Sequence, residues 1–135
     1  MKAKQIVKIA LAIVTAIYII EGLYLSFMLN TVVNQSYADY GFNNPYSNII
    51  SDEFYSRCCD RAGFRGVYTD TGLMEKYRRT IPFVLHWFVG GKAVYIYSYE
   101  IYENGHVIGG AWRTPVWFTM DFTRKPWVTD AYQVP

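Results

Sequence analysis

An apolar run from Ile9 to Leu29 constrains this chain more than any other feature of its sequence. A helix rises about 1.5 Å per residue, so this run is about 30 Å long and matches the hydrocarbon core of a bilayer. The run carries one formal charge, at Glu21. We therefore expect a transmembrane helix over residues 9–29, preceded by a short basic tail over residues 1–8.

The distribution of basic residues predicts the orientation of this helix. Lys2, Lys4 and Lys8 precede the run, and the next Lys or Arg is Arg57. The positive-inside rule then predicts a single-pass protein of the cell membrane, with its N-terminus in the cytoplasm and its C-terminal domain outside. A cleaved signal peptide is the alternative. Bulky residues near the outer end of the run make a poor cleavage site, which favours an uncleaved signal-anchor.

Glu21 lies near the middle of the apolar run, where a charge costs on the order of a few kcal/mol. Two interpretations are open. The helix can shift so that Glu21 reaches the interface or stays protonated, or Glu21 can pair with a polar group on a partner's membrane helix.

Composition beyond the anchor argues against several functional classes. From residue 39 onward the charges balance, with ten basic and ten acidic residues, so no basic patch indicates nucleic-acid binding. The two cysteines, Cys58 and Cys59, are adjacent, and a bridge between them would be strained. We expect one buried cysteine, with an intermolecular disulfide or redox sensing as the alternative. The sequence has no zinc, phosphate-loop or dinucleotide pattern, and we expect no cofactor and no metal.

The first part of the outer region is expected to contain a tether and short helices. Residues 30–50 are polar and loop-like, so the domain is expected over residues 51–135. Ser51 can cap a helix that stops at Gly63. A short extended segment, Phe64 to Thr69, and a second helix from Asp70 to Arg79 follow.

From Ile81 the apolar period changes to two, which predicts strands. Gly90-Gly91 and Asn104-Gly105 are typical hairpin turns. The pattern predicts an α+β fold, in which one to three helices pack on a four-stranded antiparallel meander. The expected strands are Ile81–Phe88, Ala93–Tyr102, His106–Thr123 and Trp127–Val134.

The order of these elements, and the ending Trp127-Val128-Thr129-Asp130, resemble small membrane-anchored extracytoplasmic domains of the ketosteroid-isomerase-like (nuclear-transport-factor-2-like) fold. A cystatin-like α+β fold gives a similar order. The resemblance implies a sheet wrapped on helices. It implies no particular function, since the fold hosts enzymes, binding cups and structural domains.

Aromatic side chains are the main candidates for binding. Tyr95, Tyr97 and Tyr99 alternate along one strand and share one face. Either this face is core and the aliphatic face is exposed, or the tyrosines form a contact surface. His86 lies in an apolar strand and suits a core or rim position, whereas Asp121 could approach Asp130 as a carboxylate pair. The candidate binding residues are Tyr95, Tyr97, Tyr99, Trp112, Trp117, His86 and Asp121, and Glu21 is the candidate membrane-helix contact.

Three functional hypotheses follow from these observations. The first is a membrane-anchored extracytoplasmic module, without catalysis, that binds a protein partner or forms a homodimer through an aromatic sheet face. The second is a cup for a small ligand, either a binding site or an enzyme site, that uses His86 or Asp121. The third is an accessory or immunity-type membrane subunit that acts through its anchor helix, with Glu21 at the contact.

Overall fold

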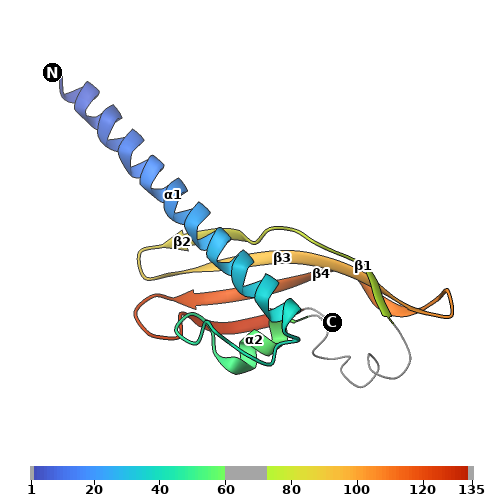
Figure 1. Cartoon of the computed structure of the whole chain (residues 1–135). Helices are drawn as coiled ribbons and strands as arrows, with labels where there is room; N and C mark the ends of the chain where they lie inside the picture. The colour runs from blue at the N-terminus through green and yellow to red at the C-terminus, as the bar shows by residue number, and fades with distance from the viewer. Residues whose placement is uncertain (1, 60–72, 134–135) are drawn as a thin grey trace.

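The computed structural model describes residues 2–59 and 73–133, and it combines one long helix with an antiparallel sheet. Helix α1 spans Ala3–Ala38 and helix α2 spans Asp52–Cys58. Figure 1 shows α1 crossing the sheet and extending far beyond it toward the N-terminus. The strands are β1 (Leu73–Arg79), β2 (Phe83–Trp87), β3 (Gly90–Glu103), β4 (His106–Asp121) and β5 (Val128–Gln133).

The α+β class and the antiparallel meander β2-β3-β4-β5 are confirmed, but the sheet has a fifth strand. The prediction of a helix over Asp70 to Arg79 was wrong for its described part, because Leu73–Arg79 is strand β1. β2 pairs with residues 90–94 of β3, and β1 pairs with residues 97–102 on the same edge. β3 is longer than β2, so the backbone N–H and C=O groups of β3 beyond β2 need another hydrogen-bonding partner. Residues 73–79 provide it as a strand, and this pairing outweighs the weak helical pattern of their sequence. The extended segment expected over 64–69 lies outside the described residues.

Residues expected to form a tether instead continue the long helix. α1 has no break until Asp39, where Gly41, with φ near +70°, donates its N–H to the Ser36 carbonyl at 2.7 Å. Leu29, Val32 and Val33 are fully buried, so the second half of α1 belongs to the core of the domain. The domain therefore begins inside α1 rather than at residue 51.

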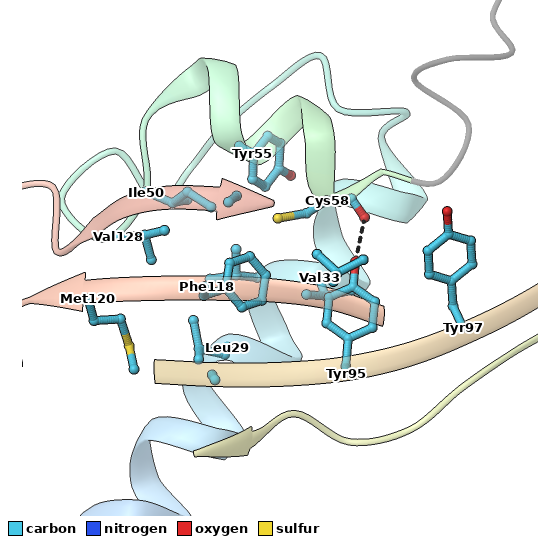
Figure 2. Packing of buried hydrophobic residues seen from close by; sticks show 14 of the residues in the cluster. Leu29, Val33, Ile50, Tyr55, Cys58, Tyr95, Tyr97, Phe118, Met120 and Val128 are labelled. Atoms are coloured by element: carbon cyan, nitrogen blue, oxygen red, sulfur yellow. Dashed lines mark hydrogen bonds between the residues drawn. The ribbon is translucent and has the colours of Figure 1, made fainter. Parts of the chain in front are cut away.

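The core lies between one face of the sheet and the two helices. Figure 2 shows Leu29 and Val33 of α1, Cys58 of α2, and Tyr95 and Phe118 of the sheet packed together. Ser51 caps α2 by accepting the Phe54 N–H, as its sequence predicts. Cys58, Tyr95 and Phe118 are buried in this core, whereas Phe54, Val94 and Trp127 are half-buried. The inner face of the sheet is the face that contacts α1 and α2.

Tyr55 joins α2 to the end of α1, and its loss should destabilise the domain. Its fully buried phenol donates to Asp39 Oδ2 at 2.6 Å, and burial together with this hydrogen bond raises the pKa of Tyr55. Tyr55→Phe is expected to lower the free energy of unfolding by about 1.5–3 kcal/mol, the usual contribution of a hydrogen bond to a charged group. The matched control, Tyr132→Phe, removes an exposed hydroxyl and should change it by less than about 0.5 kcal/mol.

The same hydrogen bond predicts a pH dependence that chemical denaturation in detergent micelles can measure. Because the pKa of the Tyr55 phenol is raised in the folded state, its contribution to the free energy of unfolding is complete at neutral pH. This contribution declines as the pH rises above about 10, the ordinary tyrosine pKa. The difference between the parent and Tyr55→Phe should therefore shrink above that pH. An equal difference at pH 7 and at higher pH would contradict this assignment.

Candidate functional site

The tyrosine stripe expected as a possible contact surface lies in the core. Tyr95, Tyr97 and Tyr99 are at most 2% exposed, and the rings of Tyr97 and Tyr99 stack with centroids 5.9 Å apart. Tyr95 donates its hydroxyl to the Cys58 carbonyl at 3.3 Å (Figure 2). Of the two open interpretations, the structure supports the one in which the tyrosine face is buried and the aliphatic face of β3 is exposed.

The other polar and cysteine candidates are held in local contacts. Asp121 is the last residue of β4, and its Oδ1 accepts from the Thr123 hydroxyl at 2.6 Å and from the Thr123 N–H at 3.0 Å in the turn that follows. These hydrogen bonds, with Arg124 nearby, lower the pKa of Asp121. A catalytic carboxylate pair would raise the pKa of one member, so this shift has the opposite sign. Cys58 and Cys59 are both buried, and neither forms a disulfide within residues 2–59 and 73–133.

His86 and Glu21 come together where α1 leaves the sheet. The His86 ring stacks on Tyr18 with centroids 4.1 Å apart, and His86 Nε2 lies 2.9 Å from the Tyr18 carbonyl oxygen. A Cβ at Gly22 would lie 3.5 Å from the same nitrogen, so glycine leaves room for the ring to approach α1 closely. His86 Nδ1 lies 3.8 Å from Glu21 Oε2. Glu21 thus has a basic neighbour within its own chain, although its side chain remains 61% exposed.

A cavity of about 290 Å³ opens beside this junction. Its walls combine apolar rings with one acid and one histidine. Since the His86 ring is held between Tyr18 and Gly22, it is positioned as a packing and hydrogen-bonding group rather than as a free base. The residues lining the cavity are Glu21, Tyr24, Leu25, His86, Trp87, Phe88, Phe122 and Trp127.

The outer face of the sheet, which points away from α1, carries a row of apolar side chains across four strands. The antiparallel register places Phe83 beside Val94, Val94 beside Trp117, and Trp117 beside Tyr132. Register partners share a face, and these residues alternate with the buried ones on each strand. Phe83 is 71% exposed, Trp117 44% and Tyr132 56%. We call these four residues, Phe83, Val94, Trp117 and Tyr132, the outer row.

A polar row runs parallel to the outer row, one register step away. Leu85 pairs with Lys92, Lys92 with Thr119, and Thr119 with Asp130. Lys92 and Asp130 are both exposed, and no ion pair involves either of them within residues 2–59 and 73–133. Lys92 on β3 and Asp130 on β5 therefore lie on the same face of the sheet, with β4 between them, and neither has an ion-pair partner among these residues.

Of the sequence-predicted residues, the structure places Trp117 in the outer row and His86 and Glu21 at the junction with α1. Trp112, 78% exposed, lies toward the N-terminal end of β4, and Asp121 is the last residue of the same strand. The sequence interpretation missed Phe83, Leu85 and Tyr132. The period-two pattern of their strands was the available signal, but it shows which residues share a face without showing which face is exposed.

Comparisons of this chain with protein-family models, with curated proteins and with solved structures find no match. The resemblance to ketosteroid-isomerase-like or cystatin-like domains stays a prediction. α1 is long and apolar enough to cross a membrane.

Proposed function

We propose that this chain is a membrane-anchored extracytoplasmic interaction module that acts without catalysis, and that its partner is a second copy of the same chain. The outer row is the observation that carries the proposal, through its members on β3, β4 and β5, namely Val94, Trp117 and Tyr132. Large exposed apolar patches on small domains commonly mark contact surfaces, and aromatic residues are enriched in them. α1 supplies the anchor, because its first 22 described positions, 3–24, are almost entirely exposed and apolar enough for lipid.

The charges beside the outer row favour a homodimer over an unrelated partner. A two-fold axis along β4 brings Trp117 opposite its own copy and Val94 opposite Tyr132. The same axis puts Lys92 of one copy opposite Asp130 of the other, because β3 and β5 are the two neighbours of β4. Each dimer then has two such ion pairs beside an apolar centre, the arrangement of core and rim that protein interfaces use. Both copies are anchored in one bilayer with the same orientation, so the two-fold axis must run along the membrane normal.

A charge-swap experiment tests the homodimer. Lys92→Glu and Asp130→Lys should each place like charges together and weaken dimerisation about tenfold or more. The double variant should restore it, because the pairing is re-formed with reversed sign. The readout is the oligomeric state of the full chain in detergent micelles over a range of concentrations, measured by analytical ultracentrifugation.

A matched pair of tryptophan variants tests the apolar centre of the same interface. Trp117→Ser should abolish dimers, whereas Trp112→Ser removes an even more exposed indole outside the outer row and should leave dimers intact. A parent chain that stays monomeric at every concentration would overturn the homodimer, as would a double charge swap that fails to recover it.

The ligand-cup hypothesis has one observation in its favour, the cavity beside His86 and Glu21. Its volume is near the lower limit for ligand pockets. The residues around it offer no assembled nucleophile and base, so the interaction module is the better-supported function.

A further inference from the structure

The segment 81–89 is the most apolar exposed stretch of the chain outside α1. Every second residue of β2 points away from α1, and the turn after β2 adds two more apolar side chains. Phe88 at the tip of this turn is fully exposed, and Trp87 is 47% exposed. The exposed members are Ile81, Phe83, Leu85, Trp87, Phe88 and Val89, and the segment has no Lys, Arg, Asp or Glu. A water-facing edge strand normally carries charge or proline to prevent aggregation.

Contacts with α1 fix how far this segment reaches along the anchor. Ser26 donates its hydroxyl to the Pro82 carbonyl, and His86 stacks on Tyr18. Between Ser26 and Tyr18 the helix covers about 12 Å, and between Pro82 and His86 an extended strand covers about 13 Å. β2 therefore runs beside α1 in the opposite direction, toward the N-terminus. The turn beyond His86 lies at the level of Tyr18 or closer still to the N-terminus.

The length of the anchor then places this turn at the membrane. A span of about 20 residues counted from Lys4 reaches Leu23. Tyr18 then lies about 8 Å inside the outer boundary of the apolar slab. Starting the span after Lys8 places Tyr18 deeper still. A span that starts at Lys4 or later therefore brings the β2–β3 turn to the outer boundary of the apolar slab or below it.

The backbone and the charges around the turn suit this position. An exposed strand edge in a low-dielectric medium needs hydrogen-bonding partners for its backbone groups. α1 supplies two: the Ser26 hydroxyl donates to the Pro82 carbonyl, and the Tyr18 hydroxyl lies 3.4 Å from the His86 backbone nitrogen and accepts its N–H. The Val89 carbonyl accepts the Phe122 N–H at 2.9 Å, so the turn after β4 lies against the same tip. That second turn carries exposed Arg124 and Lys125, which are suited to phosphate groups of anionic lipids.

We propose that the β2–β3 turn and the outward side of β2 lie in the outer interface of the bilayer and contact phospholipid directly. The proposal rests on the proposed function in one respect, since it requires α1 to span the membrane. Trp87, Phe88 and Val89 then enter the upper acyl region, just below the level where interfacial tryptophans concentrate. The domain is then held against the membrane by a second contact, beside its anchor, instead of swinging freely on α1.

Tryptophan quenching in vesicles tests this placement. Two single-tryptophan forms of the full chain keep either Trp87 or Trp112, with the other three tryptophans replaced by phenylalanine. Each is reconstituted into vesicles of phosphatidylcholine and phosphatidylglycerol, with or without bromine on the acyl chains. Trp87 should be quenched about twofold or more strongly than Trp112, because interfacial tryptophan lies within reach of the bromine atoms and Trp112 lies near the far end of β4.

A charged residue at the tip provides the second arm. Phe88→Asp should lower the quenching of Trp87 toward that of Trp112, and near-ultraviolet circular dichroism should be unchanged because the Phe88 side chain is fully exposed. The matched control, Phe42→Asp, changes an exposed phenylalanine beyond the C-terminal end of α1 and should leave the quenching of Trp87 intact.

Flotation of the vesicles distinguishes failure of the interfacial contact from failure of the membrane anchor. A chain that floats with vesicles after alkaline extraction, but whose Trp87 is quenched no more than Trp112, would overturn the interfacial contact and leave the anchor standing. A chain that does not float would overturn both the anchor and this proposal. Quenching of Trp87 that Phe88→Asp and Phe42→Asp reduce equally would also contradict the placement.

Discussion

Replacing Phe118 with alanine is expected to lower the free energy of unfolding by about 3–5 kcal/mol. Phe118 is 1% exposed and lies at the centre of the core between α1 and the sheet, with its ring centroid 5.8 Å from that of Tyr95. Its cross-strand neighbours are Ala93 and Ala131. Because both neighbours are small, neither can fill the cavity that the lost ring leaves, and the cost should fall in the upper part of this range. Small domains have a total stability of about 5–15 kcal/mol, so the variant should be close to unfolding.

Denaturant titration of the full chain in detergent micelles measures this effect. Trp112→Ala is the matched control, since it removes a larger aromatic side chain that is 78% exposed. Its free energy of unfolding should change by less than about 0.5 kcal/mol. Equal midpoints for Phe118→Ala and the parent would show that the inner face of β4 has been assigned incorrectly.

Replacing Gly90 with alanine should disrupt the start of the β3–β4 pairing. A Cβ at Gly90 would lie 2.3 Å from the Met120 carbonyl oxygen, a backbone atom that cannot rotate away. Gly90 pairs with Asp121, so the two strands must separate at this register position. Overpacking of this kind commonly costs about 1–3 kcal/mol, and a backbone clash should place the variant at or above the top of that range.

Gly109 offers a control on the same pair of strands. A Cβ there would lie 3.9 Å from Ile101 Cδ1, which is an ordinary contact. Gly109→Ala should therefore unfold at nearly the parent's denaturant concentration, whereas Gly90→Ala should unfold well below it. If both variants shift alike, loss of glycine itself and not the close approach to Met120 would explain the effect.

The homodimer and the membrane contact are compatible in one arrangement. With the two-fold axis along β4, β3 of one copy faces β5 of the other, and β2 lies beyond the edge of the partner sheet. Phe83 and Leu85 then stay uncovered by the partner and free to meet lipid. The two proposals also differ in their readouts, since charge at Lys92 and Asp130 is expected to control association, whereas Phe88 is expected to control depth in the bilayer.

Local signals in the sequence determined the long apolar helix and the meander. An uninterrupted apolar run needs only its length and its flanking lysines to predict a span. The hairpin turns are equally local, because Asn104 and Gly105 adopt φ values of 50° and 81° that few other residues tolerate. Period-two alternation then placed β2 to β5 nearly correctly, and Ser51 marked the start of α2.

The tertiary structure alone decided how far α1 extends, which part of it packs on the domain, and which sheet face is buried. Leu25, Leu29 and Val32 contact the domain, yet the same side chains would suit lipid equally well, so composition cannot separate a membrane helix from a core helix. β3 is apolar on both faces, and the tyrosines are buried because α1 and α2 pack on their side. β1 is a strand because β3 offers it unpaired backbone groups far along the chain. Each of these outcomes depends on a partner distant in sequence, and a local pattern contains no information about that partner.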